Sequence, residues 1–212
     1  MWPMQRLAVE ARTARTRMVI AATANRLFAA RGYDAVTVED VARAAGVSKQ
    51  TVFNHFGRKE ELVFARSAEV RDTLVAAVRD RAAGESVLAA FRAAETRFWH
   101  AVAELSGDDD EPGMFHVVTQ SPALTAYAHV SGATMIQELS AALRETTGVG
   151  DEDTRPDVVA SALAAAHGAI FERVRRRVVG GERVAAAVPG ALAAAAPAFE
   201  LLQAGLGADW TA

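Results

Sequence analysis

The sequence predicts an all-α protein of about nine helices. Hydrophobic residues recur at helical spacing along most of the chain, as at Ile20, Ala24, Leu27 and Phe28. Alanine, the strongest helix former, is abundant, and glycines and prolines stand mostly where helices would begin or end. No segment shows the alternation of apolar and polar residues that is typical of strands.

The composition narrows the classes of protein that are possible. Of the 212 residues, 51% are hydrophobic and 23% are charged, as in ordinary globular proteins. The absence of cysteine excludes disulfides, thiolate metal sites and cysteine nucleophiles. Residues 1–12 lack the apolar core of a signal peptide, and the most apolar stretch, residues 184–206, is interrupted by Pro189, Pro197 and Glu200. We therefore expect a cytoplasmic protein without a membrane span.

Charge is distributed unevenly along the chain. Residues 1–66 carry 11 Lys and Arg against 6 Asp and Glu, whereas residues 67–212 carry 12 against 20. A basic head on an acidic body is expected when only the head contacts a polyanion, although chance variation in surface charge gives the same picture. Residues 1–12 form a basic arm that is either disordered or placed along nucleic acid.

Capping residues set the expected helix boundaries. The first helix runs from about Arg12 to Ala30 and stops before Gly32. Thr37, with Asp40 three residues later, predicts a capping box for a second helix that ends near Ala45. Further helices are expected at about 48–56, 59–78, 86–105, 122–147, 156–179 and 187–206, and another begins near residue 113.

The segment from Thr37 to Phe56 predicts a helix-turn-helix. Ala42 is small enough to let the second helix cross the first closely, and Gly46 tolerates the left-handed geometry of the turn. The second helix then presents polar side chains outward, as a helix that reads base edges in the major groove must. The alternative is a helical hairpin within an ordinary bundle. The apolar anchors are Val41, Ala45, Val47 and Val52, and the outward polar residues are Lys49, Gln50, Asn54 and His55.

Residues 17–65 resemble the N-terminal domain of the TetR family of bacterial repressors. The resemblance implies that three helices bind DNA and that a fourth links them to a ligand-binding body. It also implies that the last two helices form a dimer interface and that a small molecule in the body releases the operator. The domains implied are residues 1–58, with the arm and the helix-turn-helix, and residues 59–212, for ligand binding and dimerisation.

The resemblance also implies individual DNA contacts. Phe53 stands where the family usually has tyrosine, so it can contact a thymine methyl group but cannot donate a hydrogen bond. It is kept among the base-reading residues, which are Lys49, Gln50, Phe53 and Asn54. Residues matching phosphate contacts are Thr37, Ser48, Thr51, His55 and Lys59.

Aromatic and polar residues of the body are candidates for a ligand pocket, because apolar pockets use a few placed polar groups for specificity. An ordinary packed core is the alternative. His100 and Glu104 are too few for a metal site, and neither a metal nor a cofactor is predicted. The arginines of residues 173–177 are expected to be solvated or to pair with Glu172 and Glu182, and the alternative is that they meet an anionic ligand or the acidic loop. The pocket candidates are Phe98, Phe115, His116, Tyr127, His167 and Phe171.

Together these patterns predict a transcriptional regulator and not an enzyme. We expect a homodimeric repressor, paired through its last two helices, that leaves a palindromic double-stranded DNA operator when a small hydrophobic or amphipathic ligand binds. Two alternatives remain at this point. One is a helical-bundle enzyme with His116 or His167 as its base, and the other is an architectural DNA-binding protein without an effector.

Overall fold

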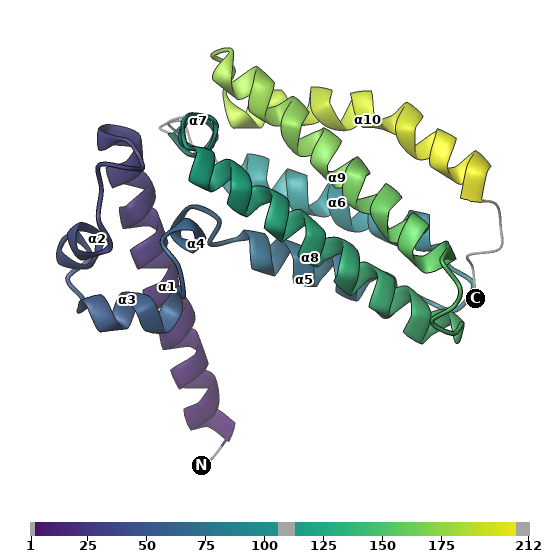
Figure 1. Ribbon diagram of the computed structural model, residues 1–212, viewed down its shortest axis with the longest axis horizontal. Coiled ribbons are helices and arrows are strands. Elements are labelled where there is room, and N and C mark those ends of the chain that lie inside the picture. Colours follow the sequence, from purple (N-terminus) through teal and green to yellow (C-terminus); the bar gives the residue numbers. More distant parts are fainter. Residues whose placement is uncertain (1–2, 106–112, 207–212) are drawn as a thin grey trace. The chain divides into compact units, whose positions relative to one another are not determined.

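The computed structural model describes residues 3–105 and 113–206, which contain ten helices and no strand (Figure 1). The predicted all-α class is therefore confirmed for these ranges. Contacts divide the chain into two units, the first comprising residues 1–67 with 113–127, the second 68–112 with 128–212. The functional boundary after residue 58 stays a prediction. The helices are α1 (Pro3–Arg31), α2 (Val38–Ala44), α3 (Lys49–His55), α4 (Glu60–Val63), α5 (Ser67–Arg79), α6 (Val87–Leu105), α7 (Gly113–Gln120), α8 (Pro122–Thr147), α9 (Arg155–Val179) and α10 (Val184–Leu206).

The first unit is built around α1. Helices α2, α4 and α7 each pack against α1, and α3 packs against α2. Their inward side chains form one buried hydrophobic cluster, which removes apolar surface from water and supplies most of the stability of such short helices. Its largest fully buried members are Ile20, Phe28, Phe56, Leu62 and Leu124.

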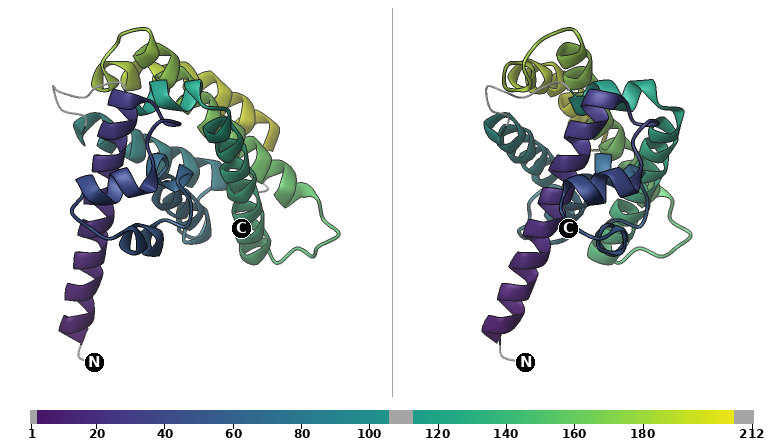
Figure 2. Two further views of the ribbon diagram at one scale, coloured as in Figure 1. Left: turned by 60° about the vertical axis from the view of Figure 1, so that its left-hand side comes forward. Right: turned by 90° about the vertical axis from the view of Figure 1, so that its left-hand side faces the viewer.

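Helix α1 begins at Pro3, about nine residues before the expected start, and its first turns continue past α3 (Figure 2). The expectation that residues 1–12 are disordered is therefore wrong from residue 3 onward, whereas the alternative that they lie along nucleic acid stays a prediction. Proline at the first helical position suits the start of a helix, because its missing N–H would have no partner there. Residues 7–11, Leu-Ala-Val-Glu-Ala, contain mostly good helix formers.

The single helix expected from Lys59 to Val78 is broken into α4 and α5, which accounts for ten helices in place of nine. The break is a turn at residues 64–66, closed by a hydrogen bond from the Ser67 amide to the Phe64 carbonyl at 2.9 Å. Residues on its two sides pack in different units: Leu62 and Val63 are buried in the first, and Leu74 belongs to the second. The helical spacing of apolar residues alone does not show that the two halves of this segment pack in different units.

The second unit has α10 packed along both α6 and α9 (Figure 1). Arg144 of α8 holds the connection to α9: it donates to the carbonyls of Gly150 and Asp153 and pairs with Asp157 at 2.7 Å. The helix boundaries here follow the predicted caps closely, with one exception. Helix α10 starts at Val184, so Pro189 lies beyond the first turn that the sequence assigned to it.

Helix α10 is long and apolar enough to span a membrane, because its mean hydropathy reaches 1.5 within residues 184–205. The sequence expectation that no segment has this length and apolarity is therefore wrong on this measure. Only 28% of that window is buried within the described residues. The same composition also occurs in helices that pack in soluble assemblies, and α10 packs along two helices of its own unit. Much of its apolar surface is therefore left uncovered by the rest of the chain that the structure describes.

Gly46 offers a test of the fold because its φ of +68° lies in the left-handed region. We predict that Gly46→Ala lowers the free energy of opening of α2 and α3 by about 1 kcal/mol, since a Cβ disfavours this backbone conformation. Hydrogen exchange of the α2 and α3 amides measures this.

Gly132→Ala is the matched control, because Gly132 is an exposed residue within α8 and a Cβ there meets nothing within 4 Å. It should slow exchange in α8, raising the opening free energy by about 0.5 kcal/mol through helix propensity. Equal effects of the two substitutions would contradict the assigned conformation of Gly46.

Candidate nucleic-acid interface

Helix α2 begins with the predicted capping box. The Asp40 amide donates to Thr37 Oγ1 at 3.1 Å, and the Thr37 amide donates to Asp40 Oδ2 at 3.0 Å. The bond from the Thr37 amide, together with a further one from Thr37 Oγ1 to Asp40 Oδ2 at 2.8 Å, lowers the pKa of the Asp40 carboxyl below its usual value. The box thus fixes the start of α2 through two neighbouring residues, as the sequence predicts.

The turn between α2 and α3 depends on Gly46. Its positive φ lets the chain reverse, and the Val47 amide then donates to the Ala42 carbonyl at 3.0 Å. Ala42 is buried, so no larger side chain separates the two helices there. Ser48 caps α3 by accepting a hydrogen bond from the Thr51 amide at 3.0 Å. Cap, glycine and small residue therefore form the helix-turn-helix that was predicted.

Helix α3 has one buried face and one exposed polar face. Val52 is its buried residue, and Phe56 is buried directly after its end. The four predicted base-reading residues, Lys49, Gln50, Phe53 and Asn54, are all exposed. Their spacing of one, three and one places them on a single face. Gln50 Nε2 donates to Asn54 Oδ1 at 2.9 Å, which orients both amide groups on that face.

Phe53 is 42% exposed, and it is the large apolar side chain on the outward face of α3. Leaving an aromatic ring exposed to water is unfavourable, so covering this ring with a partner would gain free energy. A thymine methyl group is one such partner.

The predicted phosphate contacts are arranged less uniformly. Thr37 and Ser48 are exposed, whereas Thr51 and His55 are partly buried. The hydroxyls of Ser48 and Thr51 lie 2.8 Å apart and share a hydrogen bond. Each hydroxyl has further capacity to bond to a phosphate oxygen.

Lys59 makes contacts inside its own unit. Its Nζ donates to the Tyr33 carbonyl at 2.6 Å and lies 4.0 Å from the centre of the Tyr33 ring. Burial lowers the pKa of Lys59, and burial together with a hydrogen bond to Glu60 raises that of Tyr33. Two of the three ammonium hydrogens are not used by the carbonyl bond, so the predicted phosphate contact is compatible with this geometry.

Arg17 is a structural residue that reasoning from the sequence did not single out. Its guanidinium donates to the carbonyls of His55 and Ala65 and lies 4.2 Å from the centre of the Phe56 ring. It thereby joins α1 to the end of α3 and to the chain after α4. The planar guanidinium of arginine presents several N–H donors in fixed directions, so it can bond to two carbonyls at once more readily than a lysine ammonium can. No local pattern signals such a contact, because its partners lie 38 and 48 residues away.

The six candidate pocket residues are divided by the structure. Phe98, His167 and Phe171 gather around Trp99, with ring centres of neighbouring pairs 5.1 to 6.5 Å apart. The other described candidates belong to the first unit: Phe115 is buried there and Tyr127 stacks on Phe64. The side chain of His116 lies outside the described residues. Sequence reasoning missed Glu95, a buried carboxylate beside this aromatic group.

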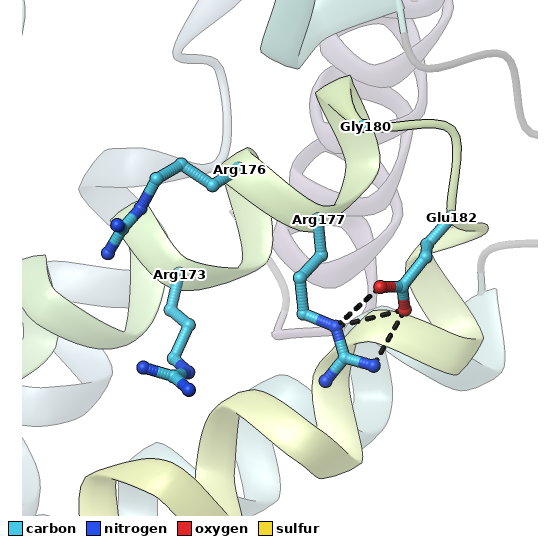
Figure 3. Close-up of a pocket in the computed structure, with 5 residues that line it drawn as sticks. All are labelled: Arg173, Arg176, Arg177, Gly180 and Glu182. Carbon is cyan, nitrogen blue, oxygen red and sulfur yellow. Dashed lines mark hydrogen bonds and ion pairs between the residues drawn. The ribbon is translucent and has the colours of Figure 1, made fainter.

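The basic run on α9 pairs with the two acidic residues expected from the sequence. Arg175 bonds to Glu172 at 2.6 Å, and Arg177 makes a bidentate contact with Glu182 (Figure 3). Arg177 also lies against α10, where a Cβ on Gly190 would come within 1.7 Å of its guanidinium. Glycine at this position therefore leaves room for the arginine between α9 and α10.

Comparison with known proteins gives a consistent picture. Residues 20–65 match the family described as bacterial regulatory proteins, tetR family. The HTH-type transcriptional regulator TcmR of Streptomyces glaucescens is 33% identical over 158 residues, which cover 71% of this chain and 69% of that protein. The HTH-type transcriptional regulator AlkX of Mycobacterium tuberculosis is 43% identical over 49 residues, which cover 23% of each. Among solved structures, NalD of Pseudomonas aeruginosa has a similar fold, with a TM-score of 0.54, 20% identity and coverage of 88% of this chain and 96% of that one.

Arg17 gives a prediction that separates support of α3 from contact with nucleic acid. Arg17→Met should lower the free energy of unfolding by about 1–2 kcal/mol, because two charge-assisted hydrogen bonds are lost. Thermal unfolding followed by circular dichroism measures this. Arg15→Met removes an exposed arginine two residues earlier and should leave the unfolding midpoint unchanged. Identical midpoints for both variants would show that the Arg17 contacts do not support the fold.

Proposed function

The chain belongs to the TetR family of bacterial regulatory proteins, and we propose that this DNA-binding transcriptional regulator is a repressor. It binds a palindromic operator as a homodimer and leaves the DNA when a small ligand occupies its second unit. The observation that carries the DNA-binding role is the exposed polar face of α3 on a supporting scaffold. Reaching DNA requires that the protein work in the cytoplasm.

We assign base reading to the outward face of α3. Amide side chains such as Gln50 and Asn54 match the donor and acceptor pattern of adenine, and Lys49 can donate to guanine. Phe53 contacts a thymine methyl group. Thr37, Ser48, Thr51, His55 and Lys59 hold phosphates on either side, which supports register and affinity more than sequence choice.

Dimerisation through α9 and α10 is supported by the exposed residues of these helices. On α9 the exposed side includes Val158, Ala165 and Ala169, and on α10 it includes Ala194 and Leu201. Small and apolar side chains allow two helices to approach closely, and their burial gains free energy. One recognition helix covers too few base pairs for a specific operator, so a two-fold dimer suits the proposed palindrome.

A catalytic role with a histidine base is the alternative that we do not adopt. His167 has its Nδ1 2.6 Å from Glu95, a carboxylate that is itself buried, and the matched relatives are transcriptional regulators. Among the described residues no group of three His, Asp or Glu side chains suited to a metal ion is found. Because the matched relatives are transcriptional regulators, we assign the second unit to ligand binding and not to catalysis.

Gln50→Ala tests base reading. Operators selected from a random DNA library should change at defined positions, because an amide that pairs with a base edge sets sequence preference. Fluorescence anisotropy with the selected operator and its single-base variants measures the change. Lys59→Ala is the contrasting variant, and it should weaken binding to all of these DNAs alike and flatten the salt dependence. If Gln50→Ala also weakened every operator by the same factor, the assignment of Gln50 would be wrong.

A pair of surface substitutions tests the dimer. Ala165→Glu combined with Ala194→Glu should convert the dimer to a monomer and abolish operator binding, because charges would face each other across an apolar interface. Light scattering coupled to size exclusion measures the mass. Ala166, next to the first site, is unsuitable because it is buried within its own unit.

Ala133→Glu, on the exposed side of α8, is the control and should leave the dimer intact. A dimer that persists in the double variant would place the interface elsewhere on the protein.

A further inference from the structure

An open groove runs between α6, α9 and α10 in the second unit, with a volume of about 320 Å³. This is at the lower end of the range of roughly 300–1,000 Å³ for small-molecule sites. Its two sides differ in chemistry. The side formed by α10 is apolar throughout, and Ile170 of α9 extends it. The residues of the apolar side are Pro189, Leu192, Ala193, Ala196 and Phe199.

The side formed by α6 is polar. It presents Arg92, Glu95, Thr96 and His100, which recur at intervals of one helical turn. Arg92 and His100 are exposed at the rim, whereas Glu95 is only 1% exposed. The occupant of this groove must therefore be amphipathic, with an apolar body against α10 and a polar group toward α6.

Glu95 decides where that polar group can lie. Its Oε2 accepts a hydrogen bond from Trp99 Nε1 at 3.1 Å, and its Oε1 lies 2.6 Å from His167 Nδ1. Both carboxylate oxygens thus have partners from the protein, as a buried carboxylate requires. The Glu95 carboxylate repels a second negative charge beside it. An acidic group of the ligand would therefore lie nearer the exposed residues of the α6 side than beside Glu95.

Arg92 decides the sign of that group. Its guanidinium lies 5.6 Å from the centre of the Phe199 ring, which holds it over the apolar side of the groove. In the part of the chain that the structure describes, the ion pairs involve other basic residues, and Arg92 takes part in none of them. Arg92 therefore offers several N–H donors and an unneutralised charge at the edge of an apolar surface.

We infer that this groove binds a small amphipathic organic acid. The apolar body lies against Leu192, Ala196 and Phe199, and the acidic group pairs with Arg92 at the rim, one turn from Glu95. The site joins α6 to both helices of the proposed dimer interface. Its role as the effector site rests on the proposed function, whereas binding of the acid does not.

Two fluorescent probes test this inference. 8-Anilinonaphthalene-1-sulfonate carries an aromatic body with one sulfonate, and N-phenyl-1-naphthylamine carries the same rings without it. The sulfonate probe should bind saturably at one site per subunit and about tenfold more tightly than the neutral probe, because a charge-assisted contact distinguishes them. Fluorescence titration of the full chain measures both affinities.

Two substitutions of arginine on α6 locate the contact. Arg92→Gln should remove the preference for the sulfonate probe, and Arg97→Gln, at an exposed position that does not line the groove, should retain it. Ala196→Trp should fill the groove and weaken both probes. Equal affinities of the two probes for the unmodified protein, or an unchanged preference in Arg92→Gln, would overturn the inference.

Operator binding without a probe separates this test from that of the proposed function. Arg92→Gln leaves α3 untouched, so it should bind a selected operator with unchanged affinity. If Arg92→Gln loses the preference for the sulfonate probe but still binds the operator, the result supports the groove as the acid-binding site. Failure of the unmodified protein to select any operator would instead contradict the proposed function and leave the probe titration independently interpretable.

Discussion

The shortness of α3 is the constraint on which the first unit depends. Seven residues form too few hydrogen bonds to hold a helix in water, and Val52 is the residue within α3 that is buried. Support therefore comes from outside the helix: Ser48 caps its start, Phe56 is buried after its end, and Arg17 binds the carbonyl of its last residue. A helix supported at both ends can leave its whole outer face to a partner.

This arrangement separates the residues that build the motif from those that face outward. The supporting residues have partners inside the unit, whereas Lys49 and Phe53 have exposed side chains. We therefore expect substitutions on the outer face to change the proposed recognition of DNA with little effect on the fold. Lys59 is the exception, because its bond to the Tyr33 carbonyl gives it an internal contact besides its proposed phosphate. Its removal therefore affects both properties.

The parts of the fold that depend on neighbouring residues could be predicted from the sequence. The capping box of Thr37 and Asp40 and the turn at Gly46 are local, and both appear where expected. Contacts between distant residues could not be predicted. The Glu95–His167 pair spans 72 residues, and the break after α4 depends on which unit each half packs in. The individual DNA contacts that we propose rest on resemblance and residue chemistry, because the fold exposes one face of α3 without specifying which base each side chain meets.

Helix α10 links the stability of the second unit to the assembly and the ligand binding that we propose. Its inner side covers the second unit, part of its surface forms the groove beside α6, and much of its apolar length is exposed in a single chain. Exposed apolar surface of this extent is costly in water, and pairing with a second copy would cover it. An acid bound against Leu192 and Phe199 would contact the same helix that pairs, so occupancy and dimer geometry would share one element. A change in the position of α10 would therefore alter the free energies of acid binding and of dimerisation together, as linkage between two binding equilibria requires.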